Sequence, residues 1–368
     1  MALRKFLLAA AGALACTLAA AAEPCRVAFD IGSSGIRGGA SNSAVVVRAS
    51  IDYLASLRAG RNLDDALEPT ITALSAAKEQ GLSDTACARV GGGFSAWRLA
   101  AQQDFARLLW NLANIHAATG VAVLVIPQHV EGAYGYFGAR QLLGRWLGTS
   151  HVLDIGGGSL QVSGEQSSFG LALGQKTWHQ QLCLALRKTS TVPCALQPMN
   201  GEERLKVSAL AAQKLHGIGT TLPDKLTMTA ISRPVTQGVA PAVERLLGKP
   251  PGQTGFSRAE LRSAIEQLAH LTLEETAVRV AIRANYAAYL LSDMLLVDGL
   301  MQATGGADLQ IAEIDLTNLP GLLADDQAFR WVGYYGCYLE RLGRVGVEAY
   351  ASDPATCALT DGSGWPNR

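Results

Sequence analysis

Two segments of the chain combine an aspartate with a turn rich in glycine and serine, which suits them to bind phosphate. The first reads FDIGSSGIRGG over residues 29–39 and the second reads HVLDIGGGSLQ over residues 151–161. In each, an apolar strand leads into Asp30 or Asp154, an apolar residue and then the turn. Glycine lets backbone N–H groups approach a ligand closely, and successive N–H groups form an anion site. One such turn is a weak signal, whereas two facing copies would hold a phosphate chain and a hydrated cation between them.

Hydrophobic spacing predicts the elements that position these turns. In the first half, it predicts strands over residues 26–31, 44–47 and 121–126, and helices over 62–78, 104–119 and 127–143. Gly120 is a helix stop, and Pro69 means that the first helix is either kinked or restarts there. This alternation of strands and helices is typical of an α/β fold.

The second half repeats the alternation and marks its helix starts clearly. Its polar stretch 161–175 predicts hairpin strands, followed by a helix over 208–218 and a loop over 248–254. Ser257 with Glu260, and Thr272 with Glu275, have the spacing of capping boxes. A long buried helix over 280–303 and a strand over 309–315 should follow. Because a strand, an aspartate and a glycine turn open each half, we expect a duplicated α/β chain with a cleft between the copies.

Length, composition and charge narrow the class of protein. The chain has 368 residues, which suits two domains. Its 49% hydrophobic and 17% charged residues argue against disorder. The formal net charge is zero, which disfavours a nucleic-acid partner because such proteins usually carry a basic excess. Any polyanion must therefore be held by local features. The sequence leaves the oligomeric state open, with a homodimer as one possibility.

The N-terminus has the layout of a signal peptide. Arg4 and Lys5 precede an apolar Ala/Leu stretch, and Ala20–Ala22 supply small residues before the expected cleavage point. This predicts a signal peptide over residues 1–22 and a periplasmic or secreted protein, with a retained membrane anchor as the alternative. The later apolar run 290–301 contains two aspartates, so no membrane contact is expected once the signal is removed.

Cysteine usage agrees with export. The chain has seven cysteines, and Cys16 lies in the predicted signal peptide, so six remain. An even number in an exported chain indicates disulfides, with buried free thiols as the alternative. Cys183–Cys194 would close a short loop, and Cys337–Cys357 would fix the C-terminal tail. Cys25 and Cys87 are then left to form the third expected pair.

Together with the two turns, further segments make the sequence resemble the exopolyphosphatase and guanosine-pentaphosphate phosphohydrolase (Ppx/GppA) family of the actin-like, sugar-kinase-like superfamily. They are SAWRLA at 95–100, IPQHVEG at 126–132, HGIGTT at 216–221 and the stretch 283–316. The resemblance implies two ribonuclease H-like domains, a phosphate chain bound in the cleft and a divalent cation, usually Mg²⁺. The corresponding domains are residues 23–145, with 325–350 packing back on them, and residues 146–324, followed by a tail over 351–368.

The same resemblance assigns roles to individual residues. Glu131 matches the catalytic glutamate, which takes a proton from the attacking water, and Arg37 matches the arginine after the first loop. Asp30 and Asp154 would hold the metal through water. Arg98 would contact phosphate, or pair with a carboxylate as a structural residue. The remaining expected phosphate ligands are Ser33, Ser34, Gly35, Gly156, Gly157, Gly158, Ser159 and Gln161.

Three departures from the family pattern bear on the substrate. Ser34 replaces an asparagine, residues 128–130 lack the usual acidic cluster, and Gln161 stands where the family has glutamate. Gln161 and the run 131–136 are similar to the apyrases, nucleoside di- and triphosphate hydrolases of the same superfamily. The sequence therefore predicts a phosphohydrolase that removes the terminal phosphate from polyphosphate or a nucleoside polyphosphate. An apyrase-like nucleotidase and a non-catalytic phosphate or nucleotide sensor are the alternatives.

Overall fold

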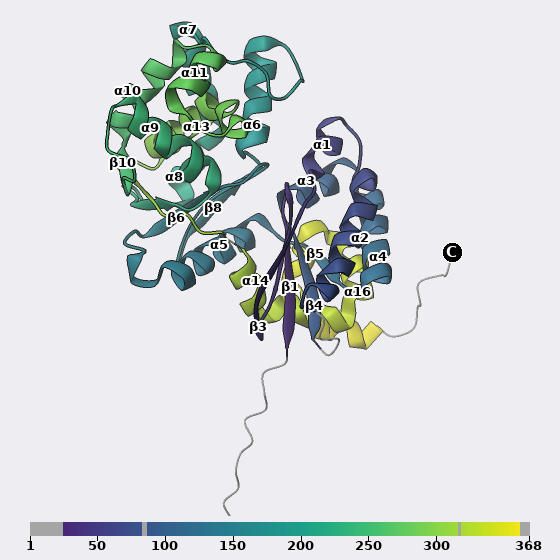
Figure 1. Cartoon of the computed structure of the whole chain (residues 1–368). Coiled ribbons are helices and arrows are strands. Elements are labelled where there is room, and N and C mark those ends of the chain that lie inside the picture. The colour runs from purple at the N-terminus through teal and green to yellow at the C-terminus, as the bar shows by residue number, and fades with distance from the viewer. Residues whose placement is uncertain (1–24, 83–86, 316–317, 361–368) are drawn as a thin grey trace, which may run out of the picture.

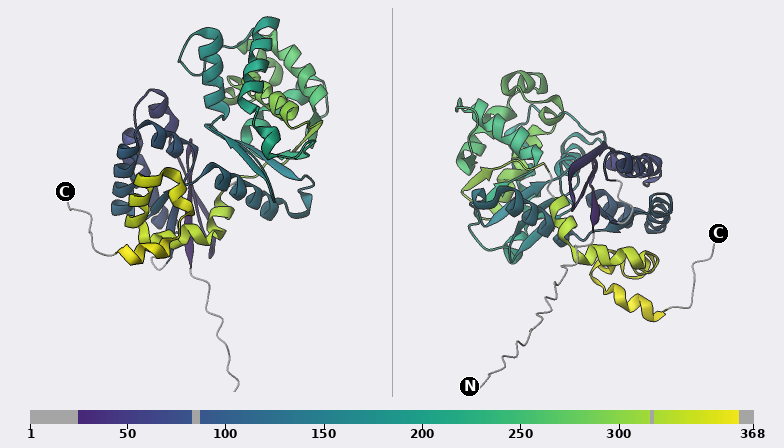
Figure 2. Two further views of the ribbon diagram at one scale, coloured as in Figure 1. Left: turned by 180° about the vertical axis from the view of Figure 1, so that it is seen from behind. Right: turned by 60° about the horizontal axis from the view of Figure 1, so that its bottom comes forward.

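The computed structural model describes residues 25–82, 87–315 and 318–360. The predicted signal peptide and the last part of the tail lie outside these residues. The described chain forms two lobes, each with its own sheet and covering helices (Figure 1). Views from behind and from below show the same division, with the C-terminal helices lying against the N-terminal lobe (Figure 2). The prediction of an α/β fold with two domains is confirmed.

The first sheet has five strands in the order β3-β2-β1-β4-β5. Strand β1 pairs antiparallel with β2 and parallel with β4, which continues in parallel to β5. The strands are β1 (Arg26–Ile31), β2 (Gly35–Ala40), β3 (Ser43–Ser50), β4 (Ala88–Gly93) and β5 (Ala122–Val125).

The second sheet has six strands in the order β10-β11-β9-β6-β7-β8. Strand β6 pairs antiparallel with β7 and parallel with β9, so it has the same two kinds of neighbour as β1 in the first sheet. Each strand that carries a motif aspartate therefore occupies an equivalent place. The strands are β6 (His151–Ile155), β7 (Leu160–Gly164), β8 (Ser168–Leu171), β9 (Met228–Ala230), β10 (Gly255–Ser257) and β11 (Asp308–Ile311).

Helices cover both sheets. In the first lobe they are α1 (Tyr53–Arg58), α2 (Asp64–Glu79), α3 (Ser95–Gln103), α4 (Phe105–Thr119), α14 (Leu319–Ala324), α15 (Asp326–Arg330) and α16 (Tyr335–Val345). Helix α5 (Gln128–Leu143) contacts α14 and one face of the second sheet. The other face carries α6 (Gln175–Leu182), α7 (Gly201–Leu215), α8 (Ile218–Thr221), α9 (Ala240–Leu246), α10 (Arg258–Ala269), α11 (Leu273–Val280), α12 (Ala284–Ala287) and α13 (Leu290–Ala303) (Figure 1).

Local signals set several helix ends as predicted. The Asp104 carboxylate accepts the Arg107 N–H at the start of α4, and Gly120 ends that helix in the left-handed conformation. Both predicted capping boxes are present, at the starts of α10 and α11. Helix α2 is one continuous helix that contains Pro69, so of the two alternatives expected there, a kink or a restart, the restart does not occur.

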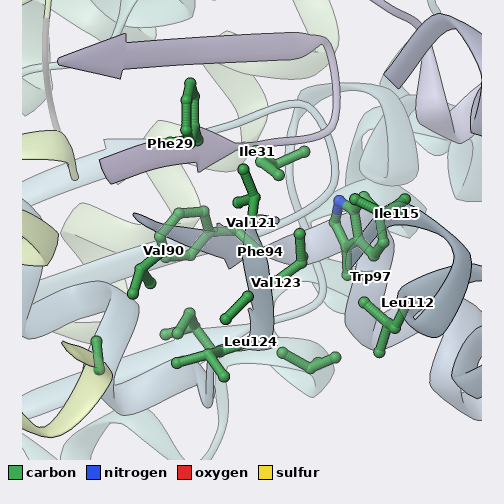
Figure 3. Close-up of a cluster of buried hydrophobic side chains, with 14 of the residues drawn as sticks. Phe29, Ile31, Val90, Phe94, Trp97, Leu112, Ile115, Val121, Val123 and Leu124 are labelled. Atoms are coloured by element: carbon green, nitrogen blue, oxygen red, sulfur yellow. The ribbon is translucent and has the colours of Figure 1, made fainter. Parts of the chain in front are cut away.

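The core of the first lobe is built from both ends of the chain. Aromatic and branched side chains of β1, β4, β5, α3 and α4, among them Phe29, Trp97 and Leu112, pack beside the sheet (Figure 3). Residues from α14 to Cys357 belong to the same core. At the outer edge of β5, the Tyr335 hydroxyl donates to the Val123 carbonyl at 2.9 Å and the Tyr338 hydroxyl accepts the Val125 N–H at 2.8 Å.

Three predictions from the sequence are wrong in extent. The helix expected over 208–218 is α7, which begins at Gly201 and ends at Leu215. The helix expected over 280–303 begins late: Val280 is the last residue of α11, which ends at the left-handed Ala281 with φ of 43°, and the segment then forms the short helix α12 and, from Leu290, helix α13. The strand expected over 309–315 is β11, which ends at Ile311. No glycine or proline stands at residues 281–289 or 312–315, where the last two segments depart from the expected helix and strand.

All three predicted disulfides are present: Cys25–Cys87, Cys183–Cys194 and Cys337–Cys357. Cys25 and Cys87 immediately precede β1 and β4, which are adjacent parallel strands with Arg26 opposite Ala88. Within the part of the chain that the structure describes, no helix has the length and apolar character needed to cross a membrane.

Candidate functional site

The first turn places a buried carboxylate beside an arginine. Asp30 lies near the end of β1, directly opposite Arg37 of β2, so both side chains lie on one face of the sheet. Arg37 Nη1 is 3.6 Å from Asp30 Oδ2, and that oxygen has no hydrogen-bond partner although it is buried. The Asn318 side chain, just before α14, lies close enough to the same carboxyl group to lower its pKa. A buried oxygen without a partner is a candidate ligand for a cation or for ordered water.

The second turn is held from behind by helix α6. The N–H groups of Gln175 and Lys176 donate to the carbonyls of Gly156 and Gly157, at 2.9 and 2.8 Å. The Thr177 hydroxyl donates to the Gly158 carbonyl at 3.2 Å. These bonds draw the carbonyl oxygens of the turn toward α6, away from the side on which an anion would approach.

Gly174 allows this close packing of helix and turn. A Cβ atom at Gly174 would lie 2.4 Å from the Gly156 carbonyl oxygen, 2.7 Å from the Gly158 nitrogen and 2.5 Å from the Ser159 nitrogen. All three contacts are with backbone, which cannot move aside without displacing the turn. Glycine is therefore required at position 174.

The two turns face each other where the lobes meet. A Cβ atom at Gly157 would lie 2.6 Å from the Ser33 hydroxyl, so the tips of the two turns are in contact. Gly158 is similarly close to Ser95 at the start of α3. Beside these contacts, Lys176 Nζ lies 3.0 Å from the Asp52 carboxylate of the other lobe. The structure thus brings together the two segments that the sequence singled out.

Glu131 projects from the first turn of α5 into the same region. It is 6% exposed, and its Oε2 accepts a hydrogen bond from Arg98 Nη2 at 2.5 Å. Arg98 also donates to the Ile126 carbonyl at 2.8 Å. Of the two roles expected for Arg98, the geometry matches pairing with a carboxylate. Gly132 lets α5 lie close to the second sheet, because a Cβ there would be 2.2 Å from the Ser163 hydroxyl.

Three carboxyl groups influence one another at this place. Burial raises the pKa of Asp30 to about 6, with Arg37 opposing and Glu131 adding to the rise. Burial, followed by the charges of Glu131 and Asp30, raises the pKa of Asp154 to about 7. Like charges in a buried site favour the protonated form unless a cation is present. This concentration of acidic groups fits a divalent cation, which prefers oxygen ligands such as Asp30, Asp154 and their bound water.

The remaining predicted residues lie on or beside the two turns. Ser33 is buried and Ser34 is exposed, and Gly35 begins β2. In the second turn, Gln161 lies opposite Asp154 across β6 and β7, and its Nε2 donates to the Ser159 hydroxyl at 3.1 Å. Both side chains are buried.

Sequence reasoning missed three contributors to the site. Ser232 follows β9, accepts the Ile155 N–H at 2.8 Å and lies close enough to the Asp154 carboxyl group to lower its pKa. The Asn318 side chain likewise lies beside the Asp30 carboxyl group and lowers its pKa, and Gly174 allows the second turn to pack closely on α6. None lies in a recognisable motif. The only signal for Ser232 would have been that a strand parallel to β6 must end beside Asp154.

Solved structures share this architecture. The Aquifex aeolicus member of the Ppx/GppA protein family superposes with a TM-score of 0.61 at 16% identity, covering 82% of this chain and 96% of that one. An exopolyphosphatase from Cytophaga hutchinsonii gives a TM-score of 0.58 at 14% identity over 81% and 96% of the chains. The chain has the Ppx/GppA fold. That fold has two domains of the actin-like type.

Sequence comparison adds one relative. An uncharacterized protein of Streptomyces coelicolor is 30% identical over 205 residues, which are 53% of this chain and 57% of that protein. No family model matches the chain. The Ppx/GppA fold is therefore shown by structure, and the chemistry must be argued from the site.

Proposed function

We propose that this protein is an exported, metal-dependent hydrolase that releases the terminal phosphate from inorganic polyphosphate or a nucleoside polyphosphate. The observation that carries the proposal is the convergence of Asp30, Glu131 and Asp154 where two glycine-rich turns meet. A phosphate group bound there would receive N–H and hydroxyl donors from both turns. The fold, which is that of proteins named as exopolyphosphatases, supports the same reaction class.

Glu131 is the proposed general base. The Glu131 carboxylate, near the start of helix α5, lies beside both glycine-rich turns. A water molecule there could be aligned with the terminal phosphorus. General-base catalysis contributes about 10²- to 10⁴-fold to a rate. The greater part must come from alignment and from neutralising charge on the phosphoryl group. Arg37 supports this second role because its guanidinium borders Asp30 and can grip two phosphate oxygens at once.

Mg²⁺ is the proposed cofactor, held by Asp30 and Asp154 through water. When bound, it would neutralise charge on the phosphate oxygens. The protein's own contribution is to keep the two carboxyl groups in place, Asp30 through Asn318 and Asp154 through Ser232. Because the pKa of Asp154 is raised to about 7, cation binding at neutral pH would displace a proton from this carboxyl group.

Nucleoside di- and triphosphates are a second candidate substrate. The buried pair of Ser159 and Gln161 favours them, because their resemblance to the water-orienting serine and glutamine of apyrases is matched by a direct hydrogen bond. The three disulfides favour export in either case, since such bonds persist in oxidising compartments.

The decisive experiment compares Glu131→Gln with wild type for phosphate release from polyphosphate, pyrophosphate, nucleotides and guanosine pentaphosphate in Mg²⁺. We expect kcat to fall by about 10²- to 10⁴-fold on the preferred substrate. Glu165→Gln is the matched control, because Glu165 is 71% exposed in its pair with Arg140. Wild-type turnover by Glu131→Gln would refute the role of Glu131. Tight binding by wild type without product release would instead indicate a sensor.

A further inference from the structure

A group of arginines continues outward from Asp30 across the edge of the first sheet. Arg37 is the cross-strand partner of both Asp30 on β1 and Arg48 on β3. Asp30, Arg37 and Arg48 therefore form one row on the same face. Their side chains become more exposed along the row, at 3%, 32% and 49%. Two arginines directly opposite each other repel, so the row is favourable only with an anion beside it.

That anion is supplied by Asp315. One of its carboxylate oxygens, Oδ2, accepts a bond from Arg48 Nη2, and the other, Oδ1, accepts one from Arg233 Nη2. Arg48 belongs to β3 of the first lobe, whereas Arg233 follows β9 of the second. A single carboxylate thus joins arginines from both lobes. The pKa of Asp315 is lowered by Arg48 and Arg233, and Arg37 is close enough to lower it further.

Two arginines at this place share one close carboxylate. Arg37 is paired with Asp30, whereas Arg48 and Arg233 both donate to Asp315, and the Glu313 contact with Arg233 is long, at 4.0 Å. Arg48, Arg233 and Asp315 are all 42–49% exposed, so a ligand in solution can reach them. Arginine forks placed around one two-oxygen anion are the arrangement that recognises phosphate.

We propose that Arg48 and Arg233, with Arg37, form a second phosphate subsite that Asp315 occupies when no substrate is bound. The subsite would take the part of a phosphoanhydride chain beyond the bond being broken, so it favours chains of three or more phosphates over pyrophosphate. This inference rests on the proposed function. Arg37 borders both places and would connect them. On binding, the phosphate chain replaces the Asp315 carboxylate between the two arginines.

The same ion pairs could instead serve only to hold the two lobes together. That structural role predicts a different effect of Asp315→Asn on substrate binding. If Asp315 competes with substrate, Asp315→Asn frees both arginines and strengthens binding of a phosphate chain. If Asp315 only ties the lobes together, Asp315→Asn leaves binding unchanged or weakens it. The sign of this change therefore separates the two roles.

The test is calorimetric binding of pyrophosphate, tripolyphosphate and ATP in Mg²⁺, with all variants built on Glu131→Gln to suppress turnover. We expect Arg48→Gln and Arg233→Gln each to weaken tripolyphosphate binding about tenfold, the loss of one charge-assisted contact, and to change pyrophosphate binding less than about twofold. Asp315→Asn should strengthen tripolyphosphate binding several-fold. If the variants change ATP binding as they change tripolyphosphate binding, the subsite also binds the phosphates of nucleotides. If they change ATP binding as little as pyrophosphate binding, the subsite is restricted to inorganic chains.

Arg330→Gln and Asp353→Asn are matched controls, because this ion pair has side-chain exposures of 49% and 53% and lies in the C-terminal segment. The inference would be overturned if these controls weakened tripolyphosphate binding as much as Arg48→Gln and Arg233→Gln do. It would also be overturned if those two variants lost equal affinity for pyrophosphate and tripolyphosphate, or if Asp315→Asn did not bind tripolyphosphate more tightly. Thermal unfolding of each variant checks that it is folded. The proposed function is tested separately, by hydrolysis with the wild-type protein. If the variants change binding as expected but wild type hydrolyses no substrate, the proposed function is refuted and the subsite is supported.

Discussion

Arg98 and Glu131 form an ion pair inside the candidate site, with Nη2 and Oε2 separated by 2.5 Å. Their side chains are only 11% and 7% exposed, and the second guanidinium nitrogen of Arg98 is bonded to the Ile126 carbonyl at the end of β5. The arginine is thus fixed to the first sheet and in turn fixes the carboxylate on α5. This relationship makes Arg98 a positioning residue for the proposed base.

Arg98→Gln should lower kcat by about 10- to 100-fold, because a 1.4–2.8 kcal/mol loss in alignment of Glu131 changes the rate by that factor. KM should rise much less, since Arg98 is not expected to touch substrate. Steady-state kinetics on the preferred substrate measure both constants, and Arg98→Lys should recover part of kcat. Arg140→Gln, which breaks an exposed pair, is the control. A large rise in KM with kcat unchanged would place Arg98 on the phosphate instead.

Gly174→Ala should abolish most of the activity while the protein remains folded. The added methyl group meets three backbone atoms of the second turn at 2.4–2.7 Å, so the turn must shift away from the first. A displacement of about 1 Å in an active site can cost about 100-fold in rate. Gly336→Ala in α16 is the control, because nothing lies within 4 Å of a Cβ there. Phosphate release and circular dichroism are the measurements, and unchanged activity in Gly174→Ala would contradict this account of the turn.

The metal-free protein should lose stability as the pH rises from 5 to 8. Burial holds the pKa of Asp154 at about 7 in the folded state, against 3.8 for an ordinary aspartate. A raised folded pKa contributes stability that is present at low pH and is lost as the pH passes through the folded value. The expected loss is about 3 kcal/mol from Asp154 alone.

Mg²⁺ should reverse this trend, raising the free energy of unfolding more at pH 8 than at pH 5, because metal ligands must be deprotonated. Urea unfolding at both pH values, with Mg²⁺ or with a chelator, measures the effect. Asp154→Asn should remove most of the pH dependence and most of the response to Mg²⁺. An equal response to Mg²⁺ at both pH values would place cation binding elsewhere.

Loss of the Cys25–Cys87 disulfide should cost more stability than loss of Cys183–Cys194. The first bond closes a loop with a sequence separation of 62 and the second one of 11, so loop-closure entropy assigns about 4 and about 3 kcal/mol to them. Paired Cys→Ser variants compared by urea unfolding give the two values. The opposite order would show that the contacts around the short loop, rather than chain entropy, control its contribution.

The sequence was most informative where local chemistry decides the structure. The aspartate and glycine turns and the capping boxes at Ser257 and Thr272 depend on residue type and short spacing, and each is present as predicted. The three disulfides follow from cysteine number and from two short spacings, which leave Cys25 to pair with Cys87. The resemblance to the Ppx/GppA family added Glu131 to Asp30 and Asp154 as one candidate site, and these three carboxyl groups influence one another in the structure.

The sequence was least informative where distant segments decide the structure. Arg98 could have served phosphate or a carboxylate, and only the packing of α3 against the start of α5 distinguishes these roles. Ser232 and Asn318 reach the site because strand order brings their segments beside Asp154 and Asp30. The left-handed Ala281 interrupts an apolar pattern that gives no local reason to stop.

The tyrosines that cover the outer edge of β5 come more than 200 positions later in the chain. During synthesis, the ribosome therefore releases β5 long before Tyr335 and Tyr338 can occupy its unpaired N–H and C=O groups. An uncovered strand edge is a template on which another chain can add a strand. Nascent or prematurely terminated molecules of this protein thus carry an aggregation hazard that disappears only when the last helix docks.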